Sequence, residues 1–299
     1  YGCSDTGVFM DHCNLHQINI IGNHISYNQR AGIRQLNGAV HNLQITGNDI
    51  EYNGGHEELN SGEIVLEAPE GIVSEHVITS NTIQAIPENH GANILVWGSE
   101  VEGAMGVRIL TITGNVLGSR EKNIEIKNGS RVAISGNTIY GGRELNVHIK
   151  DSTTVNIGSN TFGTRPASTP TEVKYDDGIL IENSTHCLVN GNIISEFRNG
   201  DAEQGGAVTV VNSQNVRVSS NQIVNPYVRG VSITGGVGCV VSDNTVTAKK
   251  EGTMVDAIAV AGGKDNVVQQ NFVRSGVAVP IAIAKENGVT QGNTVFVVE

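Results

Sequence analysis

Carboxyl groups able to act in acid–base catalysis occur at two points of the chain. Glu63 and Glu67 share the segment GEIVLE, and Asp177 follows Asp176 ahead of a glycine. Hydrolysis of a glycosidic bond needs one protonated and one ionised carboxyl group flanking that bond. Neighbouring like charges raise the pKa of one group and so separate the two roles. Glu63, Glu67 and Asp177 are therefore candidate catalytic residues for a hydrolysis.

Cationic side chains between these two points suit a different reaction. Lys127, His148 and Lys150 lie in the segments NIEIK and NVHIK. Abstraction of a proton beside a carboxylate, as in a lyase, needs a base and a group that neutralises the substrate acid. The three residues are candidate catalytic residues for that chemistry. The alternative is a salt-bridged ladder with Glu125, in which each ion pair contributes little.

All these residues except Asp177, which directly precedes such a strand, share the outward positions of a strand that recurs along the chain. Apolar residues alternate with them at a period of two, which is typical of a half-buried strand. The same positions supply five candidate substrate-binding residues, namely Arg34, Asn93, Trp97, Glu125 and Glu182. The single tryptophan offers a flat apolar face to a sugar ring.

Ionisable residues disappear from these outward positions beyond Glu182. Between residues 207 and 284 the corresponding positions hold only Ala, Ser, Thr, Val, Gly and Pro. Solvation of the strand face explains charges, but it does not explain why they stop while the repeat continues. We expect this stretch to be covered by a loop or, most simply, by a second copy of the chain in a homo-oligomer such as a trimer.

A longer motif, apolar-x-apolar-x-x-Asn-x-apolar, positions these strands. Its asparagines are Asn23, Asn48, Asn81, Asn115, Asn137, Asn160, Asn192, Asn221, Asn244, Asn271 and Asn293. The shortest spacings, 22 and 23 residues, indicate the bare unit, and longer spacings predict loops. Such a unit buries its apolar face only by stacking on its neighbours. We expect the asparagines to form a hydrogen-bonded ladder at a corner, in the left-handed conformation that asparagine tolerates.

The repeat resembles that of the pectin-lyase-like superfamily over essentially the whole chain. Asp11-His12 resembles a strand of pectate lyases, and Asp176-Asp177-Gly178 with Arg229 resembles elements of polygalacturonase-type hydrolases, whose Gly-His-Gly is absent. The segment AGGKDN at 261–266 resembles a coil of the trimeric inulin fructotransferases. The resemblance implies one all-β domain over residues 1–299, a right-handed parallel β-helix of about eleven coils. It leaves the activity open among lyases, hydrolases, epimerases and phage tailspikes.

Net charge and hydropathy exclude some classes of binding partner. The formal net charge of −11 opposes binding to nucleic acid phosphates. No apolar run reaches the roughly 18 residues of a membrane-spanning helix. No metal-ligand spacing is evident, so no cofactor is expected, although Ca²⁺ binding by paired carboxylates stays open. The chain begins inside a strand-like pattern, so we expect further residues upstream.

The sequence therefore predicts an extracellular or periplasmic protein that acts on a polysaccharide or oligosaccharide. Hydrolysis of glycosidic bonds is slightly favoured, because the net charge of −11 opposes an anionic polymer. A lyase or epimerase that uses Lys and His is the second prediction. A non-catalytic protein that binds glycans, adhesive or tailspike-like, is the third.

Overall fold

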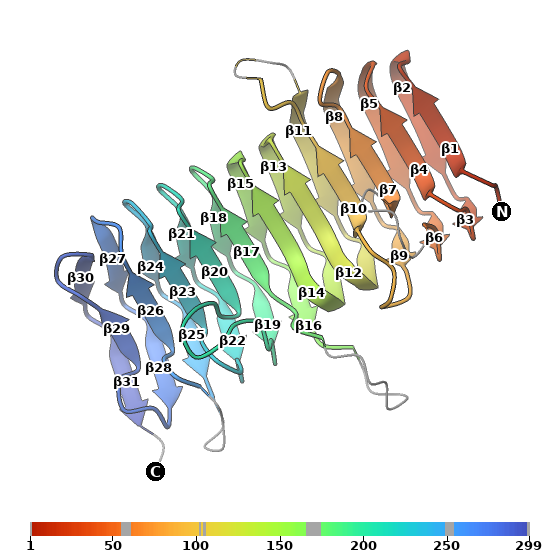
Figure 1. Cartoon of the computed structure of the whole chain (residues 1–299). Coiled ribbons are helices and arrows are strands. Elements are labelled where there is room, and N and C mark those ends of the chain that lie inside the picture. The colour runs from red at the N-terminus through yellow and green to blue at the C-terminus, as the bar shows by residue number, and fades with distance from the viewer. Residues whose placement is uncertain are drawn as a thin grey trace.

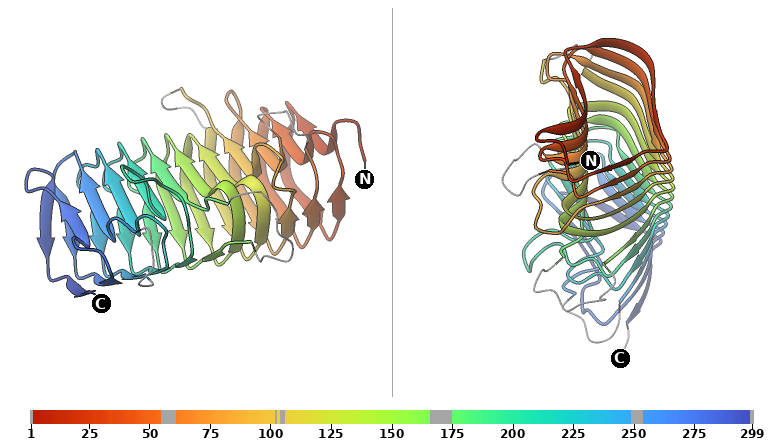
Figure 2. Two further views of the ribbon diagram at one scale, coloured as in Figure 1. Left: turned by 60° about the horizontal axis from the view of Figure 1, so that its bottom comes forward. Right: turned by 90° about the vertical axis from the view of Figure 1, so that its right-hand side faces the viewer.

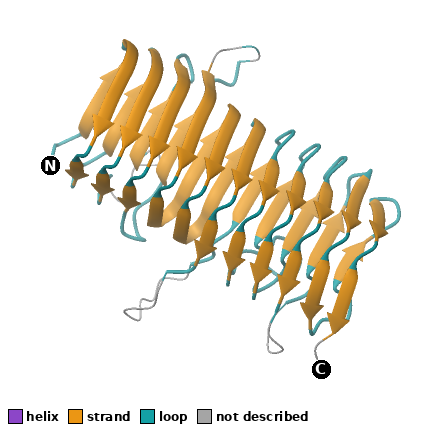
Figure 3. Ribbon diagram, turned by 180° about the vertical axis from the view of Figure 1, so that it is seen from behind, coloured by secondary structure: helices purple, strands orange, loops and turns teal. Residues whose placement is uncertain are grey.

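The computed structural model describes residues 2–54, 61–101, 103, 106–165, 175–248 and 254–297. In these residues all regular structure is β-strand (Figure 3). The strands stack in parallel from the N-terminal coil at one end to the C-terminal coil at the other (Figure 1). One sheet has 11 strands, one from each coil, which confirms the predicted parallel β-helix of about eleven coils.

Each coil contributes to three sheets, which we number in the order in which the chain enters them. Sheet 1 contains β1 (Thr6–Asp11), β4 (Ala31–Leu36), β7 (Gly62–Glu67), β10 (Ala92–Trp97), β17 (Ile179–Glu182), β20 (Val208–Val211), β23 (Val231–Thr234), β26 (Ile258–Ala261) and β29 (Ile281–Ile283). Sheet 2 contains β2 (Asn14–Ile21), β5 (Ala39–Thr46), β8 (Ile72–Thr79), β11 (Gly106–Thr113), β13 (Gly129–Ser135), β15 (Thr153–Gly158), β18 (Leu188–Asn190), β21 (Arg217–Ser219), β24 (Val240–Ser242), β27 (Asn266–Gln269) and β30 (Gly288–Gln291).

Sheet 3 contains β3 (His24–Ser26), β6 (Asp49–Glu51), β9 (Thr82–Gln84), β16 (Thr161–Gly163), β19 (Ile193–Ser195), β22 (Gln222–Val224), β25 (Thr245–Thr247), β28 (Phe272–Ser275) and β31 (Thr294–Val297). Two long strands, β12 (Val116–Lys127) and β14 (Thr138–Lys150), begin in sheet 3 and end in sheet 1. The loops of the other coils that join sheet 3 to sheet 1 are therefore missing at these two coils.

One continuous hydrophobic core fills the solenoid. Its inward positions are mostly Ile and Val, the β-branched residues that pack well on a pleated surface. Seen nearly along the axis, successive coils lie one behind another (Figure 2), and the register pairs inward residues of neighbouring coils, such as Ile94 with Ile124. Because each coil buries its apolar side only against its neighbours, the stack supplies the rigid frame on which outward residues are held.

The predicted asparagine ladder is confirmed and runs unbroken from Asn23 to Asn293. At Asn115, for example, the backbone N–H and the side-chain amide both donate to Asn137 Oδ1, at 2.9 and 3.0 Å. The predicted left-handed conformation of the asparagines is wrong. Positive φ falls on the residue before each one, such as Gly136 (65°) before Asn137. The asparagine is needed for its amide, and the preceding residue makes the turn.

Replacing Asn137 with alanine should lower the free energy of unfolding by about 2–4 kcal/mol, because the buried donors of Asn115 and the carbonyl of Ile112 lose their partner. Asn293→Ala is the matched control, since the last asparagine has no following rung and is only partly buried. Urea denaturation followed by circular dichroism measures both. Equal effects of the two substitutions would contradict the stabilising role assigned to the buried ladder.

Candidate functional site

The register of sheet 1 brings six of the predicted site residues together. In the central outward row, Glu125 on β12 lies beside His148 on β14. In the neighbouring row, Trp97, Lys127, Lys150 and Glu182 follow one another on β10, β12, β14 and β17. Lys122, at the bend of β12, joins them through Glu125. Adjacent parallel strands lie about 4.8 Å apart, so the side chains of these four coils are within contact distance.

His148 is oriented by a carboxylate. Its Nδ1 lies 3.2 Å from Glu125 Oε1, and the other oxygen of that carboxylate is 3.1 Å from Lys122 Nζ. Burial opposes ionisation of Glu125, but the hydrogen bond with His148 and the nearby Lys122 ammonium outweigh it and lower its pKa to about 2. Glu125 is therefore ionised beside Nδ1 of His148, and its carboxylate fixes the orientation of the imidazole ring.

The Nε2 atom of His148 is buried and has no hydrogen-bond partner among the described residues. Glu182 Oε1 lies 3.3 Å away, without the geometry of a hydrogen bond, and accepts a 2.7 Å contact from Lys150 Nζ. Burial acts to raise the pKa of Glu182, but the Lys150 and His148 contacts outweigh it and lower that pKa. The hydrogen bond to Glu182 raises the pKa of Lys150, so this residue stays an ammonium. The buried Nε2 of His148 and the Lys150 ammonium therefore contact the same oxygen of Glu182.

Trp97 and Lys127 continue this cluster toward the N-terminus. The Lys127 ammonium lies 4.9 Å from the centre of the indole ring and 2.6 Å from Glu100 Oε1. The ring is half-buried, so a sugar could stack on it only if Lys127 moved. Beyond the ends of these strands lies a groove of about 470 Å³, whose lining includes Glu100, Asn128, Asp151 and Asn183. The groove therefore extends the cluster sideways across the same coils.

Three predicted site residues, Asn93, Asp177 and Glu63, are buried in the wall of the solenoid. Asn93, Asn123 and Asn146 form a second ladder at the corner before sheet 1, and Asn146 Nδ2 donates to Asp177 Oδ1 at 3.0 Å. Asp177 and Glu63 are both fully buried. The prediction that Glu63 faces outward is wrong, and neither carboxylate nor Asn93 reaches a substrate on this surface.

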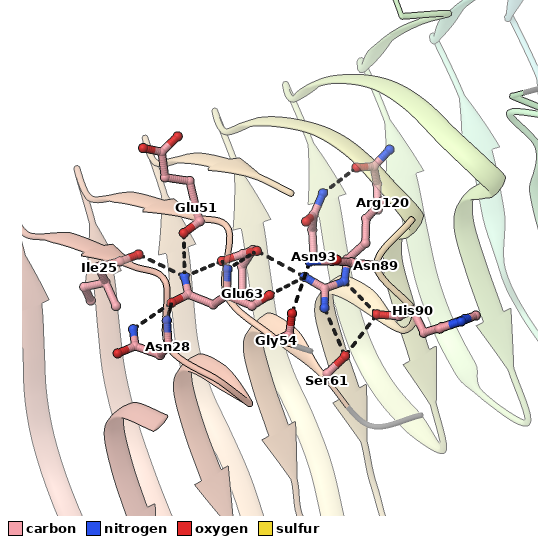
Figure 4. A network of polar contacts seen from close by, with 12 residues as sticks. Ile25, Asn28, Glu51, Gly54, Ser61, Glu63, Asn89, His90, Asn93 and Arg120 are labelled. Carbon is pink, nitrogen blue, oxygen red and sulfur yellow. Dashed lines mark hydrogen bonds and ion pairs between the residues drawn. The ribbon is translucent and has the colours of Figure 1, made fainter. Parts of the chain in front are cut away.

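Glu63 belongs to a buried polar network, drawn in Figure 4. Its carboxylate accepts hydrogen bonds from Asn53 and from Arg120 Nη1, the latter at 3.1 Å. Arg120 is also fully buried and donates to the carbonyls of Asn53 and His90 and to the Ser61 hydroxyl. Burial raises the pKa of Glu63, although Arg120 and Asn53 oppose the rise. The network joins three coils and fixes the loops between sheets 3 and 1.

Glu67 and Arg34 form a separate buried ion pair. Both Nε and Nη2 of Arg34 lie 2.7 Å from Glu67 Oε2, and both side chains are almost fully buried. Between this pair and His148, the central row holds Val65 and Leu95, which pack with Ala31 and Ala92 in a satellite apolar cluster. The predicted stripe of ionisable residues is therefore interrupted, and only its part from Trp97 to Glu182 lines an accessible site.

Sequence reasoning missed a neighbouring group of charges at the corner between sheets 3 and 1. Glu121 Oε2 accepts a 2.8 Å hydrogen bond from the backbone of Gly91 and lies 3.2 Å from His90 Nδ1. Burial, and then the charge of Glu121, raise the pKa of Glu144. The signal was a repeated Arg-Glu-x-Asn, at 120–123 and 143–146, which places like residues on adjacent coils.

The residues that resemble family signatures do not belong to the cluster around His148. Asp11 and His12 pair with each other at the exposed end of β1. Arg229 is buried, donates to the carbonyls of Asp201, Ala202 and Gly205, and pairs with Asp256 at 3.1 Å. Arg229 therefore holds a loop of its own chain in place.

The loop that Arg229 holds bears on the prediction that the small outward residues between 207 and 284 are covered. Thr209 Oγ1 contacts Gly206 within the loop, and Thr209 and Ser232 are 7% and 4% exposed. The chain itself thus covers the first part of the stretch, whereas Ala261 is exposed. A homo-oligomer stays a prediction for the remainder. No helix among the described residues is long and apolar enough to cross a membrane.

Within the part of the chain that the structure describes, one group of residues could hold a metal ion, and the sequence did not predict it. His24, Asp49 and Glu51 on β3 and β6 offer ligand atoms that lie within 4.8 Å of one another. They face outward from sheet 3, away from His148 on sheet 1. One imidazole and two carboxylates suit a divalent transition metal better than Ca²⁺, which prefers oxygen ligands only. Calcium binding stays an untested prediction.

Comparisons with known proteins agree with this architecture. The profile of the right-handed beta helix region matches residues 73–246, so the chain belongs to that family. No curated protein sequence matches the chain. Among solved structures, it is similar to an alginate lyase from Paenibacillus sp. str. FPU-7, with a TM-score of 0.55 and 13% identity over 92% of this chain and 95% of the lyase.

Two further solved structures share the fold. The periplasmic alginate epimerase AlgG gives a TM-score of 0.54 at 10% identity, over 95% of this chain and 77% of the epimerase. A tailspike protein mutant of E. coli bacteriophage HK620 gives 0.51 at 12% identity, over 90% of this chain and 52% of the tailspike, so this chain spans about half of that protein. At such low identities the likeness is one of fold.

Replacing Asp177 with asparagine should remove a pH dependence of stability. Burial raises the pKa of Asp177 to about 7, against hydrogen bonds from Gly142 and Asn146. Since the folded carboxyl holds its proton more tightly than the unfolded one, its stabilisation is present below the unfolded pKa and is lost as the pH rises toward 7. Asn also suits the positive φ of 50° at this position.

Between acidic and mildly alkaline pH, the free energy of unfolding of Asp177→Asn should therefore rise by roughly 4 kcal/mol relative to that of the wild type. Thermal melting across a pH series measures the difference, with exposed Asp243→Asn as the control. Melting curves that shift in parallel with pH for wild type and Asp177→Asn would show that folding does not raise the pKa of Asp177.

Proposed function

We propose that the chain acts on an acidic polysaccharide at the cluster around His148, by abstracting a proton next to a substrate carboxylate. The observation that carries this proposal is the buried Nε2 of His148, which lies against the same Glu182 oxygen that the Lys150 ammonium contacts. Cations also concentrate here. Three of the five lysines in the described residues, Lys122, Lys127 and Lys150, lie in this cluster, although the whole chain carries a net charge of −11. This local excess offsets the general repulsion of an anionic polymer.

The chemistry follows from the roles of three side chains. Lys150 exchanges Glu182 for the substrate carboxylate, which uncovers His148 Nε2 and neutralises the acid whose α-proton is to be removed. His148 Nε2 then takes that proton, while Glu125 holds the ring by Nδ1 and stabilises the imidazolium. The resulting carbanion either expels the glycosidic oxygen, which takes a proton from solvent as a C=C bond forms, or itself takes a proton from solvent on the opposite face. The first outcome is a lyase reaction and the second an epimerisation.

The folds of an alginate lyase and an alginate epimerase support this class of substrate. The tailspike neighbour supports glycan binding on the same scaffold only if its own ligand is a glycan, so it carries less weight. Because such polymers lie outside the cytoplasm, the proposal includes an extracellular or periplasmic location.

Hydrolysis, which the sequence slightly favoured, is the second candidate. Two of its three predicted carboxylates, Glu63 and Asp177, are buried in polar networks, and Glu67 is paired with Arg34. Glu121 and Glu144 make hydrolysis the alternative, because burial and the charge of Glu121 raise the pKa of Glu144 and so place two unlike carboxyl groups side by side. These two residues lie on the same coils as Lys122 and His148.

The test is a turnover assay on sodium alginate, polygalacturonate and neutral dextran. We expect reaction with an acidic polymer, seen as ultraviolet absorbance of an unsaturated uronate or as a changed sugar configuration in the proton NMR spectrum. New reducing ends without unsaturation would favour Glu121 and Glu144 and hydrolysis. Binding without turnover of any of the three polymers would favour the third prediction, a glycan-binding protein.

A further inference from the structure

The outer face of sheet 3 carries a line of tyrosines that the proposed reaction does not use. Tyr27 and Tyr52 follow β3 and β6 on successive coils and stack with ring centres 5.4 Å apart. Gln84 on β9 donates to the Tyr52 hydroxyl at 3.0 Å, and the Tyr140 hydroxyl lies 3.4 Å from Gln84 Oε1. Only 4% of the chain is aromatic, so this concentration over consecutive coils is unusual.

Tyr140 forms one wall of a pocket at the end of this line. One side of its ring covers Gly118 on the preceding coil, where any side chain would collide with the ring. On the other side lies a pocket of about 540 Å³, lined also by Thr138, Thr161, Gly163, Arg165 and Ser195. A Cβ built on Gly163 meets no atom within 4 Å, so the floor is open. The pocket therefore combines an aromatic wall, hydroxyl groups and a guanidinium.

We infer that this pocket is a second binding site for the polysaccharide, on a different sheet from the reacting cluster. A pyranose ring presents C–H groups on its faces and hydroxyls around its edge, which match the ring of Tyr140 and the surrounding Thr and Ser hydroxyls. Arg165 donates to the Tyr175 hydroxyl at 3.1 Å and retains further N–H donors for a sugar carboxylate. The site therefore takes acidic sugar units of a polymer.

The line of tyrosines predicts the direction in which the bound polysaccharide lies, namely along the solenoid axis. Coils repeat about every 4.8 Å, which is close to the length of one pyranose unit in an extended chain. Tyr27, Tyr52 and Gln84 then offer contacts to successive sugars along the solenoid axis. Two sites on one molecule raise the affinity for a long polymer without altering the reaction at His148.

The test uses the full chain with His148→Ala as background, so that polymer is not consumed, in gel electrophoresis through sodium alginate, polygalacturonate or dextran. Gly163→Trp places a bulky side chain at the open floor of the pocket, and Gly163→Ala is its matched control. Tyr140→Ala removes the wall, with Tyr227→Ala as the control at another exposed tyrosine. We expect Gly163→Trp and Tyr140→Ala to weaken retardation by an acidic polymer about tenfold, and both controls to leave it unchanged.

Unchanged retardation of Gly163→Trp, equal retardation by dextran, or no retardation of the His148→Ala parent would overturn the inference. Turnover keeps this test separate from that of the proposed reaction. In an otherwise wild-type chain, Gly163→Trp should retain its rate on a short oligosaccharide and lose affinity only for the polymer. If wild type turns nothing over while Gly163→Trp still reduces retardation, the reaction is wrong and the second binding site stands.

Discussion

Replacing His148 with alanine should lower the turnover of an acidic polysaccharide by at least about 100-fold, the usual contribution of a positioned general base. Glu125 and Lys150 surround this imidazole, and no other described histidine is oriented by a carboxylate at the centre of sheet 1. Exposed His186→Ala is the matched control and should leave the rate unchanged. The assay is the rate of formation of unsaturated or epimerised uronate at saturating polymer.

Two neighbouring variants separate the roles in the cluster. Lys150→Met removes the proposed partner of the substrate carboxylate, so it should raise KM and lower kcat together. Glu125→Gln keeps the shape but not the charge of the positioning residue, so it should displace the pH profile of kcat as well as lower its maximum. Near-normal rates for His148→Ala and for Lys150→Met would place the reaction elsewhere, with Glu121 and Glu144 next to be replaced.

Replacing Arg120 with methionine should lower the free energy of unfolding by about 3–5 kcal/mol, because it leaves the Glu63 carboxylate buried without its cation. It also removes donors to two loop carbonyls and to Ser61. Burial already raises the pKa of Glu63, and loss of Arg120 should raise it further. Because a folded protein loses stability with rising pH when the pKa of a buried carboxyl group is raised, the variant should have its lowest free energy of unfolding at alkaline pH.

Urea denaturation at two pH values measures this effect, and exposed Arg131→Met is the control. The double variant Arg120→Met, Glu63→Gln keeps an acceptor for Asn53 but no buried charge, so it should recover part of the loss. If the double variant is less stable than Arg120→Met, the hydrogen bonds of Glu63 matter more than its charge, and the account of this network is wrong.

The sequence was sufficient for the fold and for the rows of sheet 1, because a period of two along a strand and a constant corner residue fix the register of every coil. It could not show which outward residues are accessible. Glu63 shares its register with Asn93, at the corner where side chains turn into the wall, and that equivalence was a usable signal. Asp177 was not predictable in this way, since it joins the same ladder one residue before the position that the register assigns.

Whether an outward side chain is covered, and whether a carboxyl group is ionised, also depends on the folded chain. Val65 and Leu95 alternate like exposed strand residues, yet they are buried and pack with Ala31 and Ala92. The separation of roles among carboxylates follows from burial and pairing, which no local pattern contains. Adjacency in register is a local property, so the sequence predicted as neighbours the residues His148, Lys127, Lys150, Glu125 and Glu182. The burial of His148 Nε2 depends on the folded chain and could not be predicted in this way.

The most direct test of the proposed reaction is hydrogen exchange into the polymer. Sodium alginate or polygalacturonate is incubated in D₂O with wild type, His148→Ala or His186→Ala, and the proton on the carbon next to the carboxylate is followed by NMR. The account predicts that wild type and His186→Ala replace or eliminate that proton and that His148→Ala does not. Retention of the proton by wild type while new reducing ends form, or its loss at an equal rate with His148→Ala, would contradict it.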